Sequence, residues 1–272
     1  MPELPEVETT RRGIKQHVLN QTITKVISRK KKLRWPIPID DLNCNLTRQK
    51  FTRISRRGKY LILHSQHGWL IIHLGMSGTL RIVPADTKPM PHDHFELRFE
   101  NKIVLRLNDP RRFGAVLWES INFMQHPLIK NLGPEPLSQE FNVEWLRSKL
   151  KSRRASIKSL IMNNHLVTGV GNIYANESLF EAGLDPLIAG MEIKKHKCSD
   201  LVKAIKKTLK IAIKFGGSSL QDYVNPNGTP GYFQLQYKVY NRRGLPCRIC
   251  KSKIIKEIHS QRATYFCKKC QR

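Results

Sequence analysis

The feature that most constrains this chain is a set of four cysteines arranged as two Cys-x-x-Cys pairs, Cys247 with Cys250 and Cys267 with Cys270. Each pair can form a tight turn that directs two thiolates at one point, and the sixteen intervening residues can form a hairpin that brings the pairs together. The spacing therefore predicts a zinc ribbon that holds one tetrahedral Zn²⁺. Because four thiolates leave no position for water, this metal is expected to stabilise a small module and to take no part in chemistry.

Two disulfides, or unpaired buried thiols, are the alternative to zinc. Disulfides are rare inside cells, and a basic protein of this kind is expected to be intracellular, so zinc is the stronger interpretation. The two other cysteines, Cys44 and Cys198, are isolated in the sequence and are expected to be ordinary small apolar residues. A zinc ribbon alone says little about function, since such modules occur in ribosomal, transcription and repair proteins, but it favours a nucleic-acid partner.

Charge supports the same kind of partner. The 272 residues include 48 lysines and arginines against 21 acidic residues, which leaves a net charge of +27. This excess favours a polyanion, because neutralised phosphates release their condensed counterions. The positive residues are spread over distant segments, such as 53–59, 203–210 and 238–272, which indicates a long binding groove. An anionic membrane is the weaker alternative, since no basic helix with a broad aromatic face is evident.

Nothing in the sequence predicts a membrane segment or an export signal. No stretch approaches roughly 18 consecutive apolar residues. The first residues, MPELPEVETT, contain acids where a signal peptide would have basic residues and then an apolar run. We therefore expect a soluble, cytoplasmic protein with no membrane association, and the 40% of hydrophobic residues is enough to build a packed core.

The hydrophobic pattern changes along the chain. Short alternating or apolar runs between about residues 22 and 118, broken by glycine and proline, are typical of an antiparallel sandwich or barrel. Residues 6–19 can form one helix before them, and the prolines and glycine within 127–138 indicate a linker. After the linker, apolar residues recur three and four apart, which predicts helices over 143–150, 156–162, 174–181 and 200–215.

These patterns predict an α+β multidomain protein. We expect an N-terminal domain over 1–133 with an antiparallel β-sandwich, a helical domain over 134–237, and a zinc finger over 238–272. The segment 216–231 is rich in glycine, proline and asparagine, and it is interpreted as either a functional loop or a poorly ordered one.

The N-terminus permits a specific chemistry. Removal of Met1 would leave Pro2 with a free secondary amine, and an α-amino group titrates near pH ~8, so an appreciable fraction is unprotonated at neutral pH. Such an amine can attack an aldehyde-like sugar carbon and form an iminium. Glu3 and Glu6 would place carboxylates near the amine for proton transfer. The alternative is a plain helix start, with prolines tolerated in the first turn and acids favoured at the positive end of the helix dipole.

Seven segments decide between these readings. MPELPEVETTRRG, RRGKYLIL, HLGMSGTLRI, NDPRRFGA, LGPEPLS, GVGNIYANESLF and the terminal cysteine pairs with QRATYFC follow one another in this order. Together they closely resemble the bacterial formamidopyrimidine-DNA glycosylase family, which acts in base-excision repair. The resemblance covers residues 1–272. It implies an N-terminal β-sandwich, a helix-two-turn-helix region and a zinc finger, with double-stranded DNA containing oxidised purines or abasic sites as the partner.

The resemblance also implies how the chemistry is divided. Pro2 attacks the sugar C1′ as the damaged base leaves, and Glu3 donates a proton during opening of the sugar ring. The resulting Schiff base permits successive β- and δ-elimination of the flanking phosphates. Glu6 positions this end of the helix. Lys59 in RRGKY and Arg262 in the zinc-finger hairpin match the family's proton-donor or phosphate-binding cations.

Six further residues match DNA contacts of the family: Met76, His92, Arg111, Phe113, Arg153 and Asn172. Three of them, in HLGMSG and DPRRFG, would enter the duplex when the damaged nucleotide is extruded, and their residue types suit hydrogen bonding to the orphaned cytosine and wedging between bases. Asn172 precedes a helix, where amide groups can hold a phosphate. The segment 216–231 falls where the family closes over the extruded base.

Some features leave alternatives open. The residues at 163–165 and 241–244 differ from the commoner family pattern, and neither segment contains an expected proton-transfer residue. The related endonuclease VIII type, which prefers oxidised pyrimidines, is disfavoured by Leu4 and by the Arg-Arg-Phe of DPRRFG. A non-catalytic zinc-ribbon protein that only binds DNA is the alternative from another class, and it would not need the catalytic set. A monomer is the expected state.

Overall fold

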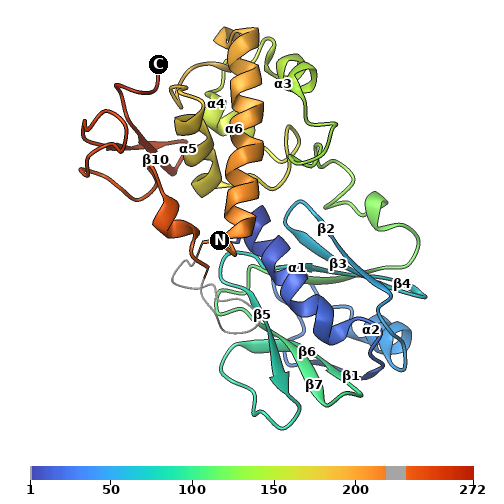
Figure 1. Ribbon diagram of the computed structural model, residues 1–272. Helices are drawn as coiled ribbons and strands as arrows, with labels where there is room; N and C mark the ends of the chain where they lie inside the picture. The colour runs from blue at the N-terminus through green and yellow to red at the C-terminus, as the bar shows by residue number, and fades with distance from the viewer. Residues whose placement is uncertain (1, 219–230) are drawn as a thin grey trace. The chain divides into compact units, whose positions relative to one another are not determined.

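The computed structural model describes residues 2–218 and 231–272, and its contacts divide the chain into two compact units (Figure 1). One unit comprises Met1–Lys130 with Phe215–Tyr232, and the other comprises Asn131–Lys214 with Phe233–Arg272. Most of the expected base-closing loop, 219–230, lies outside the described residues, as does Met1. The sequence predicts this loop within the helical domain, whereas its described ends belong to the first unit.

The first unit is built around two four-stranded sheets in which every neighbouring pair is antiparallel. One sheet has the order β1 (Ile23–Ser28), β6 (Asp93–Phe99), β7 (Ile103–Asn108) and β5 (Thr79–Pro84). The other has the order β2 (Arg53–Arg57), β3 (Tyr60–Ser65), β4 (Gly68–His73) and β8 (Ala115–Glu119). The expected antiparallel sandwich is therefore confirmed.

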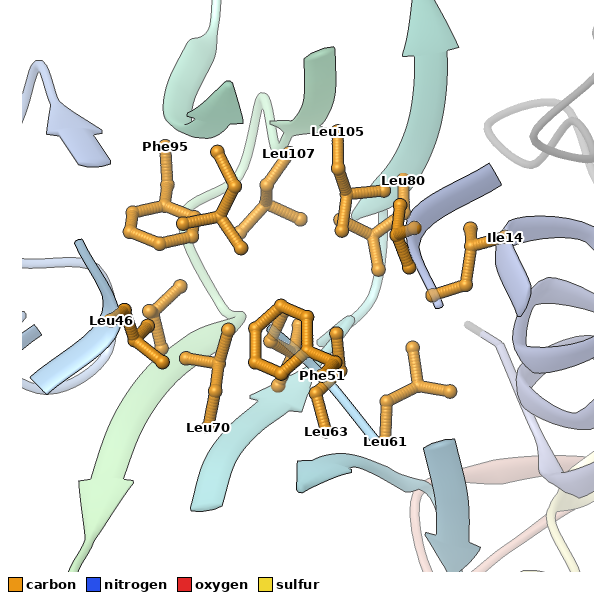
Figure 2. Close-up of a cluster of buried hydrophobic side chains, with 14 of the residues drawn as sticks. Ile14, Leu46, Phe51, Leu61, Leu63, Leu70, Leu80, Phe95, Leu105 and Leu107 are labelled. Atoms are coloured by element: carbon orange, nitrogen blue, oxygen red, sulfur yellow. The ribbon is translucent and has the colours of Figure 1, made fainter. Parts of the chain in front are cut away.

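Alternating apolar residues of the two sheets form the core of the sandwich. Figure 2 shows Phe95, Leu105 and Leu107 of one sheet facing Leu61 and Leu63 of the other, and all are buried. Burial of a side chain of this size contributes roughly 1.5–3 kcal/mol. This continuous apolar layer makes the sandwich a rigid support for the loops at its edges.

Helix α1 (Leu4–Val18) covers one end of the sandwich with its apolar face, and its Ile14 reaches the core in Figure 2. Pro5 lies in the first turn, where a missing N–H costs nothing. Glu3 and Glu6 form a reciprocal capping box that fixes the start of the helix. A second helix, α2 (Ile39–Leu46), and a short 3-10 turn, η1 (Phe123–Gln125), also belong to this unit.

The second unit is mainly helical. Its elements are α3 (Val143–Leu150), α4 (Ile157–Ile161), α5 (Asn172–Glu181), η2 (Gly190–Glu192), α6 (Lys195–Lys214), η3 (Phe233–Gln236), β9 (Ile255–His259) and β10 (Arg262–Phe266). Helix α6 packs against α3 and α5, and strand β10 packs against α5. Among the residues that the structure describes, no helix has the length and apolar character required to cross a membrane.

The antiparallel hairpin β9–β10 is joined to helix α5 by a small apolar cluster that includes Phe180, Val239, Ile254 and Cys267. A buried carboxylate strengthens this joint, because Glu177 accepts hydrogen bonds from the backbone N–H groups of residues 238–240 at 2.7–3.0 Å. Burial raises the pKa of Glu177, while these N–H groups act in the opposite direction. The ribbon is thereby anchored to the helical part of its own unit.

Candidate active site and metal centre

The first residues of the chain form a buried acidic corner in the first unit. Pro2 is buried immediately before α1, and Glu3 and Glu6 are 3% and 0% exposed. One oxygen of Glu6 accepts from the Glu3 N–H at 2.8 Å, and the other accepts from the Ser218 N–H at 2.8 Å. Glu6 therefore fixes backbone on two sides, while the Glu3 carboxylate lies at the positive end of the helix dipole beside Pro2.

The segment that meets Glu6 requires glycine. Gly217 has a φ of +78°, and a Cβ at this position would lie 2.8 Å from the Glu6 carboxylate oxygen. A Cβ on Gly231 would lie 2.4 Å from the Gly217 carbonyl oxygen. The Tyr232 N–H donates to the Phe215 carbonyl at 3.0 Å, so the two described ends of this segment are paired with each other. Ser218 carried no sequence signal of this role, because its contact with Glu6 spans 212 positions.

Lys59 lies in the tight turn between β2 and β3, where Gly58 has a φ of +57°. It is 9% exposed and lies close to His73 at the end of β4. Burial, together with the positive charges of Lys59 and Arg34, lowers the pKa of His73 to about 4, so this ring is neutral at pH 7. His73 begins the quoted segment HLGMSGTLRI, but no role could be assigned to it from the sequence, because its burial and its proximity to Lys59 arise only on folding.

Two neighbouring loops carry Met76, Arg111 and Phe113. Met76 and Phe113 are 37% and 42% exposed although both are large and apolar, and Arg111 is also exposed. The Arg111 guanidinium carbon lies 5.0 Å from the centre of the Phe113 ring, which is a cation–π contact. His92 is exposed on the preceding loop, and its carbonyl accepts from the Asp109 N–H at 3.0 Å. The structure thus brings the three expected duplex-entering residues together.

In the second unit, the β9–β10 hairpin carries Arg262 and is contacted by Asn172. Arg262 is exposed and begins β10 after a turn in which Ser260 and Gln261 both have positive φ, as a tight hairpin requires. Asn172 is the first residue of α5, and its side-chain amide donates to the Ala263 carbonyl at 3.0 Å. Lys158, which sequence reasoning missed, donates to the same carbonyl at 2.8 Å.

A cavity of about 230 Å³ opens beside this hairpin, and its lining includes Lys158, His259 and Arg262. Arg262 and the hydroxyl groups of Ser156, Ser159 and Ser260 give this lining groups that can bind a phosphate. Arg153 is exposed a few residues before α4, and its carbonyl accepts from the Met191 N–H at 3.0 Å. No described contact joins the Arg153 guanidinium to this cavity, so its expected role stays a prediction.

The four cysteines meet at one point, as their spacing predicts. All four sulfur atoms lie within 4.8 Å of one another, with 3.8 Å between Cys247 and Cys270 and 3.4 Å between Cys250 and Cys267. A regular tetrahedron with zinc–sulfur bonds of about 2.3 Å places sulfurs about 3.8 Å apart. The donor set fits one structural Zn²⁺, and no protein position is left for water.

Comparisons with known proteins agree with each part. The first 116 residues match the formamidopyrimidine-DNA glycosylase N-terminal domain, residues 132–224 match the H2TH domain of the same enzyme, and residues 244–272 match the zinc finger found in FPG and IleRS. Formamidopyrimidine-DNA glycosylases from Photobacterium damsela subsp. piscicida and Escherichia coli are 50% and 47% identical to the chain. Both alignments cover all of this chain and all of the relative.

Solved structures give the same result. The MutM (Fpg) protein from Thermus thermophilus has a TM-score of 0.89 at 36% identity, with 99% of this chain and 98% of that chain covered. A Lactococcus lactis Fpg variant in complex with DNA containing Fapy-dG has a TM-score of 0.93 at 33% identity, with both chains fully covered. Lactococcus lactis Fpg in complex with DNA containing an abasic site has a TM-score of 0.92 at 33% identity, with 99% of each chain covered.

Three features together define a class of DNA-repair glycosylases. They are a β-sandwich domain whose chain begins with a buried Pro-Glu pair, a helix-two-turn-helix domain and a four-cysteine zinc finger. Within that class, the matched domains and the full-length relatives settle the family. The chain belongs to the formamidopyrimidine-DNA glycosylase family, and it is a DNA glycosylase with one structural zinc site.

Proposed function

We propose that this chain is a bifunctional enzyme that removes oxidised purines, namely formamidopyrimidines and 8-oxoguanine opposite cytosine, and then cleaves the strand at the resulting abasic site. The observation that carries the proposal is the acidic corner, in which Pro2 is buried beside Glu3 at the positive end of α1. A secondary amine in this setting is a suitable nucleophile once Met1 has been removed.

The covalent steps follow from that arrangement. The Pro2 nitrogen attacks C1′ of the damaged nucleotide, the glycosidic bond breaks, and the base leaves with its bonding electrons. Glu3 donates a proton to the sugar ring oxygen as the ring opens, which leaves an iminium between Pro2 and C1′. Loss of the C2′ proton then expels the 3′ phosphate, and a second elimination expels the 5′ phosphate. Water then hydrolyses the iminium, which restores the Pro2 amine and releases the sugar remnant as an aldehyde. The product is a gap of one nucleotide.

Other residues bind and position. Glu6 holds the Glu3 backbone and the Ser218 backbone on either side of the nucleophile. Lys59, Arg262 and Asn172 bind phosphates of the damaged strand, and His92 and Arg153 also contact the DNA. Met76, Arg111 and Phe113 fill the space left by the extruded nucleotide. Zinc, held by the four cysteines, stabilises the hairpin that carries Arg262 and takes part in no chemical step.

We further propose that the enzyme acts as a monomer in the bacterial cytoplasm. The compared relatives are bacterial proteins named for action on DNA, and a single chain has all the residues assigned here. Sedimentation of the zinc-loaded protein with and without a duplex would measure the stoichiometry, and a complex with two chains on one lesion would contradict this part.

The test of substrate class uses end-labelled duplexes with 8-oxoguanine opposite cytosine, an oxidised pyrimidine opposite its normal partner, or no lesion. We expect cleavage of the 8-oxoguanine strand with phosphate on both sides of the gap, and much slower cleavage of the others. Preferential cleavage at the oxidised pyrimidine would favour the endonuclease VIII type. Binding of all three duplexes without cleavage would favour the non-catalytic alternative.

A further inference from the structure

We propose that Asp109 is a positioning residue that joins the loops carrying Met76, Arg111 and Phe113, and that this joint sets how well the enzyme fills the gap in the duplex. The inference rests on the proposed function, in which those three side chains enter the DNA. Asp109 is 0% exposed, so its effect is exerted through the residues that it holds.

The Asp109 carboxylate connects the two loops directly. One oxygen accepts from the Ser77 hydroxyl at 2.8 Å, and the other accepts from the Gly114 N–H at 2.7 Å. Ser77, itself 4% exposed, also accepts from the Arg111 N–H at 3.2 Å. One buried cluster therefore fixes three points: Ser77, which follows Met76; the backbone of Arg111; and Gly114, which follows Phe113.

The main chain of Asp109 adds a third segment. Its N–H donates to the His92 carbonyl at 3.0 Å, and its carbonyl accepts from the His94 ring at 3.0 Å and from the Arg112 N–H at 3.2 Å. Arg112 has a φ of +55°, an uncommon conformation for arginine that needs support from its surroundings. The loop with His92 is thereby tied to the loop with Arg111.

Close backbone packing shows that the two loops fit each other without room for change. A Cβ on Gly75 would lie 2.4 Å from the Phe113 carbonyl carbon, and a Cβ on Gly114 would lie 2.9 Å from the Asp109 carboxylate. The large side chains of Met76 and Phe113 still project into solvent. Loops whose backbone is held in place before binding lose less conformational entropy when their side chains enter a duplex, so this rigidity favours insertion.

Three substitutions separate the contributions. Asp109→Ala removes both carboxylate bonds. Asp109→Asn can keep both, because its amide oxygen can accept from Gly114 and its amide nitrogen can donate to the Ser77 hydroxyl oxygen. Ser77→Ala removes the hydroxyl that donates to the Asp109 carboxylate and accepts from the Arg111 N–H. Ser55→Ala is the matched control, since Ser55 bonds His64 at 2.7 Å in the same unit, on a strand that carries neither loop.

The experiment measures adduct formation by borohydride trapping on two substrates with the zinc-loaded protein. One is a duplex with an abasic site opposite cytosine, and the other is the same abasic strand without its complement, which leaves no gap to fill. A 2-aminopurine beside the orphaned cytosine reports insertion by its fluorescence. Trapping is repeated with adenine as the opposite base.

Asp109→Ala should lower the ratio of duplex to single-strand trapping by about tenfold or more, with a smaller fluorescence rise and weaker preference for cytosine over adenine. Ser77→Ala should show a smaller loss of the same kind, and Asp109→Asn should restore most of the ratio. Ser55→Ala should leave the ratio unchanged even where its thermal midpoint falls.

A ratio of duplex to single-strand trapping that is unchanged in Asp109→Ala would overturn the inference, including the case in which trapping falls equally on both substrates. If Asp109→Ala does not fold, an unchanged ratio in Ser77→Ala has the same meaning. Failure of the unsubstituted protein to form an adduct on either substrate would instead contradict the proposed function.

Discussion

At the residue scale, Glu6 shows how a buried acid can act by fixing backbone. Its two oxygens accept from the N–H groups of Glu3 and Ser218, so the start of α1 and one end of the glycine-rich segment share a single anchor. A buried N–H that loses its acceptor costs about 1–3 kcal/mol. Disturbance of this anchor should therefore affect both the nucleophile and that segment.

Gly217 and Gly244 provide a matched test of the anchor. Both have a φ of +78°, but a Cβ would lie 2.8 Å from Glu6 at Gly217 and would meet nothing within 4 Å at Gly244. Gly244→Ala should lose about 1 kcal/mol of unfolding free energy from backbone strain alone. Gly217→Ala should lose more and should also trap less adduct. Equal losses in urea unfolding and equal trapping would show that the Glu6 contact is unimportant.

His73 predicts a pH dependence of stability. The ring takes up a proton near pH 6.5 when unfolded but only at about 4 in the folded protein, because burial and the charges of Lys59 and Arg34 oppose the charged form. As pH falls from 6.5 toward 4, the unfolded state binds a proton that the folded state does not, so the unfolding free energy falls over this range and the effect levels off below it. His73→Gln should flatten that part of the pH profile.

Glu8 contributes to the pH dependence of stability at lower pH than His73 and therefore provides a comparison for it. Burial alone would raise its pKa, but hydrogen bonds from Arg11 and Arg12 outweigh burial and lower the pKa from 4.5 to about 2. Glu8→Gln should therefore lower the unfolding free energy by a constant amount above about pH 4.5, and this loss should shrink as pH falls from 4.5 toward 2, where Glu8 itself takes up a proton. A His73→Gln profile that coincides with that of the unsubstituted protein between pH 6.5 and 4 would contradict the assignment.

At the scale of elements, the zinc ribbon depends on its metal more than on its core. Its apolar cluster is small and includes the zinc-ligating Cys247 and Cys267 themselves, so removal of zinc should unfold the β9–β10 hairpin. Cys250→Ala should lose the bound zinc, exchange the amide hydrogens of this hairpin rapidly, and bind duplex DNA at least about tenfold more weakly, while the sandwich strands stay protected.

Cys198→Ala is the control for that experiment, because Cys198 is buried in α6 and lies outside the four-cysteine cluster. It should retain one zinc ion per chain by elemental analysis. Slow amide exchange in the β9–β10 hairpin of metal-free Cys250→Ala would show that the hairpin folds without zinc.

Most of these elements could be predicted from the sequence, and the exceptions have physical causes. Period-two runs and helical spacing predicted the strands and the larger helices, and α3 begins and ends where the pattern does. Helix α6 begins at Lys195 rather than at 200, because its first turn is polar and shows no periodicity. The two-turn helix α2 is too short to establish a period and was not predicted.

The candidate site was predictable only where motifs exist. Pro2, the four cysteines, Arg111 and Phe113 could be named from local motifs. Asp109, Ser77 and His73 lie inside the same quoted segments, but their roles come from contacts made after folding. Ser77 and Asp109 are separated by 32 positions, and no local pattern reports such a pair. Long-range hydrogen bonds are the part of a site that a single sequence does not reveal.

At the scale of the whole molecule, the charge of +27 favours a nucleic-acid partner, and the three matched domains belong to a family of DNA-repair enzymes. Charge explains attraction to any duplex, and it does not explain catalysis. What distinguishes a lyase from a DNA-binding protein on the same scaffold is a covalent bond between the chain and the sugar. The account therefore depends on Pro2.

The most direct measurement is borohydride trapping of the zinc-loaded, Met1-processed protein on a duplex with 8-oxoguanine opposite cytosine, beside Pro2→Gly and the control Pro5→Gly. Reduction converts an iminium to a stable covalent adduct. We predict an adduct that requires the lesion, is lost or greatly weakened in Pro2→Gly, and persists in Pro5→Gly, which changes the same helical turn without touching the terminal amine. An undiminished adduct in Pro2→Gly, or none from a protein that binds the duplex, would contradict the account.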